Sequence, residues 1–344
     1  MFEGDLGLRE GAGKSQIAVE IALSLEKLGR RGEVINMDSM QVYQGFPIAT
    51  NVPSLEEMRG IPHHLFSFLD PTVVDYSAHT FVEQASQLIL SIMDRGDVPI
   101  LVGGTHYYLV SLLWPNPIKE SGLNDSQGFT GGIPDESTAS LYKELCRVDP
   151  LMAEKLHQNA RRKIEQSVAF FRATGKPYSE QMLSKATDSS RSRWPCCFLW
   201  LDSDINVLEE RLNHRVDQMM ARGLLKELDE LVAVFRARNI PLDFTKGLLQ
   251  SIGGKEFEEY LHLRFPLQFP FQRISESHSE TKEVHEAIQK GTELLKIKTR
   301  QYALKQRPWI HHKIQTKTGI FRVPVTGLFF LPPQIKTKPL CRHL

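Results

Sequence analysis

Residues 11–15 read Gly-Ala-Gly-Lys-Ser and lead directly into Gln16–Leu23, a helix-forming run without internal Gly or Pro. A glycine-rich turn that ends in Lys-Ser at the start of a helix is typical of the second half of a phosphate-binding loop. Small residues there let backbone N–H groups approach phosphate oxygens, and the helix N-terminus favours negative charge. We therefore predict that Lys14 contacts a phosphate oxygen and that the Ser15 hydroxyl faces Mg²⁺. A surface turn that happens to contain Lys-Ser is the alternative.

The segment before this loop departs from the full pattern. The motif G-x-x-x-x-G-K-S/T places its first Gly five residues before Gly13, where this chain has Leu8. A buried apolar strand normally precedes such a loop, and residues 1–9 do not have that character. We expect the first strand to be missing and phosphate binding by the chain as given to be weak.

Bulk composition bounds the class of protein. The chain has 344 residues, of which 41% are hydrophobic and 24% charged, which is typical of one large or two ordinary globular domains. Its net charge is +1, so a nucleic acid would have to be bound by local basic clusters. The four cysteines show neither metal-ligand spacing nor a disulfide framework, which favours a reducing compartment. We find no apolar run of membrane-spanning length and no signal peptide, and expect no membrane association.

Short apolar runs alternate with helical periodicity in the first third of the chain. Glu33–Met37 precedes Asp38, residues 77–95 have apolar residues at helical spacing, and Val98–Val102 precedes Gly103-Gly104-Thr105. This alternation predicts a parallel α/β sheet flanked by helices. Because ligands of such sheets bind beyond the carboxyl ends of the strands, we expect Asp38 and Thr105 to lie beside the phosphate loop.

The rest of the chain is predicted mainly from composition and periodicity. Residues 115–140 are a loop or boundary, and residues 141–180 are helical with a basic cluster at 161–163. Residues 196–201 read as a return to the buried sheet, and Asp204 as the cap of a long helix. We expect a loop at 262–275, a basic helix at 283–306 and an irregular tail from 316.

Several further motifs occur in a fixed order and decide among phosphate-loop proteins. They are Asp38-Ser39-Met40-Gln41-Val42-Tyr43, Ile48-Ala49-Thr50-Asn51, Gly60-Ile61-Pro62-His63-His64-Leu65, Gly103-Gly104-Thr105-His106-Tyr107, Thr174-Gly175-Lys176-Pro177, Arg215-Val216-Asp217-Gln218-Met219, Gln250-Ser251-Ile252-Gly253 and Thr299-Arg300-Gln301-Tyr302-Ala303. In this respect the chain resembles the tRNA dimethylallyltransferases, also called tRNA isopentenyltransferases, of the eukaryotic, fungal-like type with altered termini. The resemblance covers residues 11 to about 310.

The resemblance implies transfer of a dimethylallyl group from dimethylallyl diphosphate to N6 of the adenosine at tRNA position 37. It also implies a P-loop NTPase-like sheet with an inserted, mainly helical tRNA-binding domain. The expected segments are a first part of the core at 1–116, the insertion at 117–192, a second part of the core at 193–282, a basic helix at 283–312 and an irregular tail at 313–344.

Roles for single residues follow from the same resemblance. Asp38 would orient and deprotonate N6, since a poor nucleophile needs a carboxylate within hydrogen-bond reach, and Thr105 and Arg215 would stabilise the departing diphosphate. The remaining expected site residues fall into two groups. The diphosphate-binding residues are Gly11, Ala12, Gly13, Lys14 and Ser15, the last with Mg²⁺, and the tRNA-binding residues are Ser39, Gln41, Tyr43, Arg161, Arg162, Lys163, Lys298, Arg300 and Gln301.

Each role has a simpler structural alternative. Asp38 could be a helix N-cap, Thr105 could close a Gly-Gly turn, and Arg215 could lie on a solvated helix face. We interpret His63-His64 as structural rather than as a metal pair, because adjacent residues point apart. Phe170-Phe171 reads as core rather than as a base-stacking platform.

The expected partners are the tRNA anticodon stem-loop and dimethylallyl diphosphate, with Mg²⁺ and without zinc. No zinc is expected because only Cys341 and His343 remain where many relatives carry a zinc finger. We expect a cytoplasmic monomer, with mitochondrial and nuclear pools as alternatives for the compartment. Two other function classes stay open: a P-loop small-molecule kinase, and a tRNA-binding relative with impaired catalysis.

Overall fold

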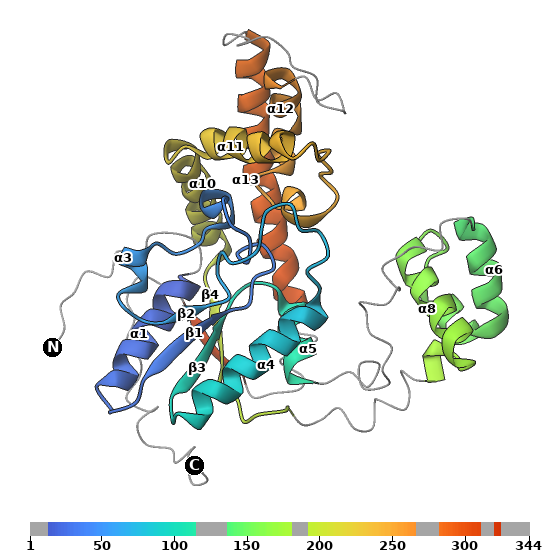
Figure 1. Cartoon of the computed structure of the whole chain (residues 1–344), viewed down its shortest axis with the longest axis horizontal. Coiled ribbons are helices and arrows are strands. Elements are labelled where there is room, and N and C mark those ends of the chain that lie inside the picture. Colours follow the sequence, from blue (N-terminus) through green and yellow to red (C-terminus); the bar gives the residue numbers. More distant parts are fainter. Residues whose placement is uncertain (1–12, 115–135, 181–191, 266–281, 311–319, 325–344) are drawn as a thin grey trace. The chain divides into compact units, whose positions relative to one another are not determined.

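The computed structural model describes residues 13–114, 136–180, 192–265, 282–310 and 320–324. It divides into two compact units, which we describe separately (Figure 1). Unit 1 comprises residues up to 76, 87–106 and those from 197 onward, and unit 2 comprises residues 77–86 and 107–196. Leu8 and the rest of residues 1–12, including Gly11 and Ala12, lie outside the described part, and so do Cys341 and His343.

Unit 1 contains a three-stranded parallel sheet in the order β2-β1-β3. The central strand β1 (Gly32–Asn36) is buried along its whole length and pairs with β3 (Val98–Val102) from Gly32 opposite Val98 to Asn36 opposite Val102. The short strand β2 (His63–His64) pairs with the other edge of β1. Both longer strands lie where their apolar runs predict them, so a parallel α/β sheet is confirmed.

Helix α1 (Lys14–Glu26) begins directly after the glycine-rich turn, as predicted. Gly13 precedes it in the left-handed conformation with φ 67°, which a residue without Cβ adopts at little cost. The helix packs on β1 so closely that a Cβ built on Gly32 would lie 2.8 Å from the Cα of Ala22. The start of α1 is therefore fixed relative to the sheet.

Between β1 and β3 the chain forms two short helices, α2 (Pro47–Thr50) and α3 (Leu55–Met58), and the long helix α4 (Ala78–Asp94). Helix α4 confirms the helix predicted at 77–95. Helix α3 begins with a capping box in which Ser54 and Glu57 exchange hydrogen bonds.

The second part of unit 1 is built from helices around a large apolar core. The elements are α10 (Ile205–Ala221), α11 (Leu224–Ala237), η2 (Gly247–Gln250), η3 (Lys255–Phe257), α12 (Glu258–Arg264) and α13 (Lys282–Ile310). Asp204 caps α10 through the N–H of Asn206, as predicted, and α13 confirms the predicted basic helix. The core gathers side chains from these helices and from the segment around α2, including Phe46, Leu228, Leu248 and Phe257.

Three local predictions are wrong. Strand β4 (Phe198–Asp202) forms as expected, but Leu199 and both cysteines before it are exposed, so the run is not a buried strand. Its partner in the described part is β5 (Ile320–Pro324), in a separate two-stranded parallel sheet. The prediction of an irregular tail at 313–344 is wrong at residues 320–324, which form β5. The sequence pattern does not reveal this strand because five residues are too few to show a clear alternation. Residues 262–264 belong to α12 rather than to a loop.

Unit 2 contains α5 (His106–Leu113), which starts at the boundary between the units, and three helices with a core of their own. These are α6 (Thr138–Val148), α7 (Pro150–Lys155) and α8 (Arg161–Thr174), and they confirm the predicted helical character of residues 141–180. Asp149, only 1% exposed, accepts hydrogen bonds from the N–H groups of Met152 and Ser179. Phe170 is buried against Tyr178, so its interpretation as a core residue is confirmed.

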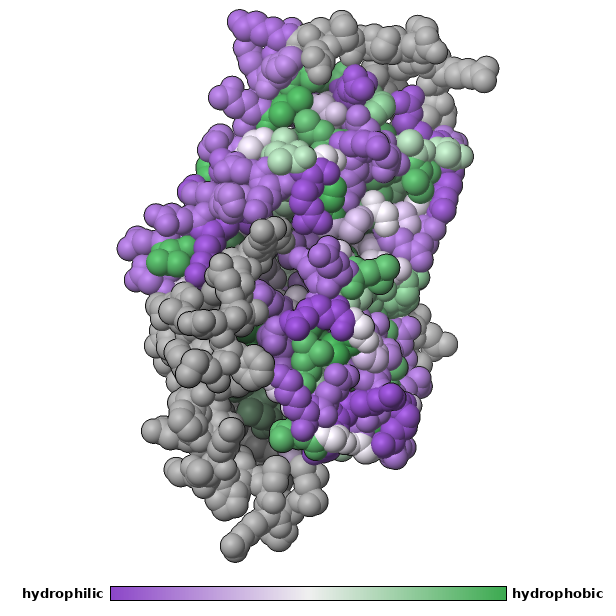
Figure 2. All heavy atoms as spheres, turned by 90° about the vertical axis from the view of Figure 1, so that its left-hand side faces the viewer, coloured by the Kyte–Doolittle hydropathy of each residue, from purple (hydrophilic) through white to green (hydrophobic). Residues whose placement is uncertain are grey.

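The face shown in Figure 2 is mainly hydrophilic, with hydrophobic side chains in small separate groups. Within the described ranges, no helix has both the length and the apolar character needed to cross a bilayer.

Candidate active site

The candidate site lies at the carboxyl ends of β1 and β3 in unit 1. The backbone joins these two ends directly: the N–H of Met37 donates to Val102 O (2.7 Å), and the N–H of Thr105 donates to Met37 O (3.2 Å). We call the residues gathered there, Asp38, Ser39, Gly103, Gly104 and Thr105, the strand-end site. Asp38 and Thr105 therefore lie at adjoining strand ends, as the strand positions predict, while residues 11 and 12 of the expected phosphate loop lie outside the described part.

Asp38 is oriented by the residue two positions before it. The Asn36 side chain is fully buried; its Oδ1 accepts the N–H of Asp38 (2.8 Å), and its Nδ2 donates to Asp38 O (3.0 Å) and Leu65 O (2.9 Å). Oδ1 of the Asp38 carboxylate accepts the N–H of Met40 (2.9 Å). This turn around its own backbone fixes the carboxylate after the strand, and Asn36 is a residue that the sequence analysis missed.

Thr105 connects the ends of the two strands through its hydroxyl. Its Oγ1 accepts the N–H of Ser39 (3.0 Å) and donates to Ser39 Oγ (3.2 Å). Thr105 therefore does more than close the Gly-Gly turn, because it holds the backbone that follows Asp38.

Gly103 and Gly104 allow this close approach. A Cβ built on Gly103 would lie 2.2 Å from both the carbonyl carbon and oxygen of Met37, a contact that no side chain could make. A Cβ built on Gly104 would lie 3.4 Å from Asp38 Oδ2 and 3.3 Å from Gln306 Nε2. The first glycine is thus required by backbone contact, and the second faces the carboxylate.

Helix α13 reaches the strand-end site with two side chains. Gln306 Nε2 and the Tyr302 hydroxyl donate to Gly104 O at 3.2 and 3.4 Å. The pKa of Tyr302 is raised, first by burial of the hydroxyl and second by the negative charge of Asp38. Tyr302 lies in the motif Thr299–Ala303, but a contact between segments almost 200 residues apart leaves no local sign in the sequence.

Lys14 at the start of α1 interacts with the charges of both Arg215 and Asp38. Part of the Lys14 side chain is exposed, but burial of its ammonium group lowers the pKa of Lys14, and Arg215 on α10 lowers it further while Asp38 opposes both. His106 follows Thr105, and its pKa is lowered to about 4, first by burial and second by the charge of Lys14, so its imidazole is neutral at pH 7. Two neighbouring cations that repel each other form a favourable site for an anion.

The expected tRNA-binding residues are placed less uniformly. Ser39 lies in the strand-end site, but Tyr43 is only 4% exposed in the main core, where burial and then Asp75 raise its pKa to about 12. In this structure Tyr43 is a core residue and does not present its ring for a direct tRNA contact. Gln41 donates its amide N–H groups to the carbonyl oxygens of Thr50 (3.0 Å) and Asn51 (2.8 Å).

The charged residues expected on the tRNA surface divide into paired and exposed ones. On α13, Lys298, Gln301 and Lys305 are exposed, and we call these three residues the basic surface of α13. Arg300 is half-buried and donates to Asn213 Oδ1 (3.3 Å). In unit 2, Arg161 contacts Glu165 (2.6 Å) and Glu136 O (2.8 Å), whereas Lys163 is exposed. The side chain of Arg162 lies outside the described part.

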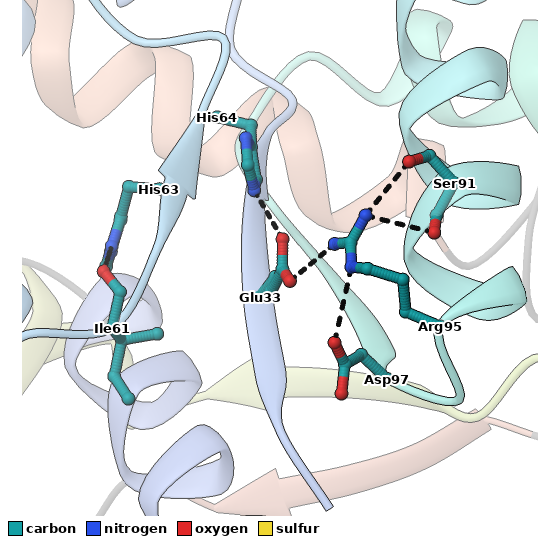
Figure 3. A network of polar contacts seen from close by, with 7 residues as sticks. All are labelled: Glu33, Ile61, His63, His64, Ser91, Arg95 and Asp97. Atoms are coloured by element: carbon teal, nitrogen blue, oxygen red, sulfur yellow. Dashed lines mark hydrogen bonds and ion pairs between the residues drawn. The ribbon is translucent and has the colours of Figure 1, made fainter.

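A second polar cluster lies at the amino end of β1, away from Asp38 (Figure 3). Burial alone would raise the pKa of Glu33, but hydrogen bonds from Arg95 (2.6 Å) and His64 (2.7 Å) hold it below its usual value. His63 points the other way, with its Nδ1 2.7 Å from Ile61 O. The two imidazoles point apart, as their adjacency predicts, and each contacts a different protein group. Among the described residues there is no group of three His, Cys, Asp or Glu side chains that could hold a metal ion.

These features are typical of a group-transfer enzyme of the phosphate-loop α/β class. They are a helix that starts after a glycine-rich turn, two cations, and an oriented carboxylate at the ends of parallel strands. The family model described as IPP transferase matches residues 41–313. The chain is 37% identical over 333 residues to the tRNA dimethylallyltransferase of Homo sapiens, covering 92% of this chain and 68% of that protein. It is 33% identical over 326 residues to that of Saccharomyces cerevisiae, covering 92% and 69%. The chain therefore belongs to the IPP transferase family.

Solved structures agree with this assignment. A eukaryotic dimethylallyltransferase acting on tRNA superposes with a TM-score of 0.74 at 31% identity, covering 92% of this chain and 72% of that one. The tRNA isopentenylpyrophosphate transferase of Bacillus halodurans superposes with a TM-score of 0.57 at 28% identity, covering 93% and 88%.

Proposed function

We propose that this protein is a tRNA dimethylallyltransferase that transfers a dimethylallyl group from dimethylallyl diphosphate to N6 of adenosine 37. The observation that carries the proposal is the oriented carboxylate of Asp38 at the strand ends, together with Lys14 at the start of α1, whose charge interacts with Asp38 and Arg215. In the reaction the N6–carbon bond forms, the carbon–oxygen bond to diphosphate breaks, and one N6 proton leaves.

Asp38 takes that proton. Its Oδ1 accepts a backbone N–H, and its Oδ2 lies beside Gly104, so Oδ2 is the oxygen we assign to N6. A carboxylate that is already oriented aligns a weakly basic amine for attack and accepts its proton as the new bond forms. The hydrogen bonds of Asn36 to Asp38 keep this geometry before substrate arrives.

Lys14 and Arg215 bind the diphosphate and stabilise the charge that develops on it as the allyl group leaves. Their mutual repulsion is relieved when the anion binds. Gly13 and Ser15 at the start of α1 supply N–H groups and a hydroxyl toward the same anion. The neutral imidazole of His106 adds no charge of its own.

The residues present fit a Mg²⁺ ion that is held mostly by the substrate. Mg²⁺ keeps several waters and commonly binds through few protein ligands plus phosphate oxygens, which suits the single Ser15 hydroxyl better than a cage of carboxylates. Such an ion would supply further neutralisation of the leaving diphosphate.

The basic surface of α13 and the 161–163 cluster on α8 bind the tRNA backbone, and residues 136–180 serve as a helical tRNA-binding segment.

A transfer assay on an anticodon stem-loop tests the proposal. The parent protein should release diphosphate and form N6-dimethylallyladenosine without consuming ATP. Asp38→Ala should lower the transfer rate about 10²-fold or more with nearly unchanged stem-loop affinity, because Asp38 acts in the reaction step. Asp243→Ala is the control, since the contacts of that carboxylate stay within its own turn, with Thr245 and Lys246.

Each rival function predicts a different result in this assay. ATP consumption without transfer would indicate a kinase, and stem-loop binding without transfer a non-catalytic relative. An Asp38→Ala variant that transfers at the parental rate would overturn the role of Asp38.

A further inference from the structure

Glu227 on α11 is a buried carboxylate that the proposed mechanism does not use. It is 6% exposed, and its two oxygens accept the N–H groups of Ile48 (2.7 Å) and Ala49 (3.0 Å). Both N–H groups belong to the first turn of α2, where a helix has no backbone acceptors of its own. One side chain thus caps a helix that precedes it by 178 residues in the chain.

The other end of α2 is held by Gln41. Its amide donates to the carbonyl oxygens of Thr50 and Asn51, and Thr50 Oγ1 donates back to Phe46 O. Asn51 ends the helix in the left-handed conformation with φ 55°. Helix α2 is therefore held at both ends by side chains, Glu227 from α11 and Gln41 from the segment that follows β1.

This arrangement leads back to the strand-end site. Gln41 directly follows Met40, whose N–H donates to the carboxylate of Asp38. Ser39, which lies between Asp38 and Met40, donates its N–H to the hydroxyl of Thr105. The segment 38–51 is consequently a closed loop, attached to the strand ends at its start and to α11 at its far end. A displacement of α2 would move both acceptors of Gln41, which lies three residues after Asp38.

Packing leaves α2 little freedom to adjust. A Cβ built on Gly253 would lie 3.1 Å from the Cβ of Ala49, and Gly253 has φ 104°, a conformation that favours glycine. Leu228 and Val232 on α11 belong to the same apolar core as Ala49. A helix packed on that side stays in place only if its polar end is satisfied, because a buried unpaired N–H is costly.

The carboxylate of Glu227 has a partner for each of its oxygens. Burial raises the pKa of this carboxyl, and the two N–H groups and Arg222 partly offset that effect. A carboxylate suits this position because it offers one acceptor to the N–H of Ile48 and another to the N–H of Ala49.

We propose that Glu227 is a positioning residue for the transfer reaction: by capping α2 it sets the place of Gln41, and through the closed loop 38–51 it orients Asp38 toward the target adenosine. This role rests on the proposed function. It assigns Glu227 to the alignment of the base with its nucleophile, and it leaves diphosphate binding to Lys14 and Arg215.

Two variants and one control test the role. Glu227→Ala removes both acceptors, and Glu227→Gln keeps the size and one acceptor. Glu230→Ala removes a carboxylate from the exposed face of the same helix, where Glu230 pairs with Lys226. At saturating stem-loop and dimethylallyl diphosphate, we expect Glu227→Ala to lower the single-turnover rate on the order of tenfold, Glu227→Gln to fall between it and the parent, and Glu230→Ala to match the parent.

Two further measurements separate positioning from general destabilisation. Calorimetry should give the same affinity for dimethylallyl diphosphate in the parent and in both Glu227 variants, since α1 lies outside the segment 38–51 that Glu227 and Gln41 hold in place. Hydrogen exchange should be faster at the amides of residues 48 and 49 in both variants, with no change in the amides of β1. A structural effect alone would weaken diphosphate binding and transfer together and would accelerate exchange in β1 as well.

Parental transfer is measured first. Its absence would overturn the proposed function and this role with it. With a transferring parent, a Glu227→Gln variant that folds, transfers at the parental rate and protects residues 48 and 49 normally would overturn only the role of Glu227. If Glu227→Ala fails to fold, Glu227→Gln alone decides, and loss of rate together with loss of diphosphate affinity in that variant would count against positioning.

Discussion

The strand-end site and the basic surface of α13 belong to the same unit but are held in different ways. In the strand-end site, the N–H of Thr105 donates to Met37 O, the Thr105 hydroxyl accepts the N–H of Ser39, and Gly103 has no room for a side chain. On α13, Lys298, Gln301 and Lys305 are exposed side chains on a regular helix. The proposed roles match this difference: aligned reactants need fixed geometry, whereas a phosphate backbone can be bound by exposed charge.

The two kinds of region should respond differently to substitution. A small change of shape in the strand-end site moves the backbone, and a change of charge there alters chemistry or diphosphate binding. On the helix surface a change of shape is tolerated, and a change of charge alters only the salt-dependent part of tRNA binding.

The largest effect is expected from Gly103→Ala. The added Cβ would lie 2.2 Å from Met37 C and O, so the end of β1 must move, and Asp38 moves with it. We expect the transfer rate to fall about 10²-fold or more, since misplacement by about 1 Å has that effect on aligned reactants. Single-turnover rates and thermal unfolding measure it. Gly104→Ala is the control, because its nearest contacts are side-chain atoms at 3.3–3.4 Å, and it should have a smaller effect; equal effects would contradict the role of backbone contact.

An intermediate effect is expected from Lys14, and it depends on pH. The pKa of Lys14 is lowered in the free protein, and a bound diphosphate should raise it again. Diphosphate affinity should therefore fall as the pH rises through the lowered pKa, and binding at alkaline pH should take up protons. Calorimetry in two buffers of different ionisation enthalpy measures this uptake.

Lys14→Arg separates charge from titration. The guanidinium stays protonated at this pH, so the variant should bind diphosphate without the proton uptake. Proton uptake that persists in Lys14→Arg would show that another group titrates on diphosphate binding. The pH dependence could then not be assigned to Lys14.

The smallest effect is expected on the helix surface. Reversing the charges of Lys298 and Lys305 should weaken tRNA binding and leave the transfer rate at saturation unchanged. The slope of log K against log salt concentration should become shallower by about 0.7–0.9 for each phosphate contact that is lost. Lys290→Glu is the matched control, because Lys290 is exposed on the same helix but already pairs with Glu259. Unchanged affinity and salt slope in the double variant would show that this surface is merely solvated.

Sequence reasoning reached the parts of this molecule that are encoded locally. The strands before Asp38 and Gly103, the start of α1 and the cap at Asp204 each follow from a few adjacent residues. Other contacts join segments that are far apart in the chain. Tyr302 and Gln306 donate to Gly104 O, and Glu227 accepts the N–H groups at the start of α2. A helical glutamate looks like any surface glutamate until tertiary packing buries it, so no local pattern could have identified Glu227.

The same limit applies to the burial of Tyr43 and to the exposure of residues 196–201. Tyr43 was assigned from a motif, which fixes the order of residues but not the side of the loop that faces solvent. Residues 196–201 are apolar, yet exposure depends on what covers them, which their own sequence does not specify.

The buried carboxylate of Asp149 has a consequence for the order in which the protein forms. It joins the start of α7 to Ser179 and so closes the end of the small helical core of residues 136–180 with polar contacts of its own. During synthesis this segment emerges after β1 and β3 and before β4, so it can collapse while the ribosome is still delivering the second half of unit 1. The large core around α11 must wait for the last helices, and a delay in translation after residue 180 would leave the helical segment folded and α2 still without its cap.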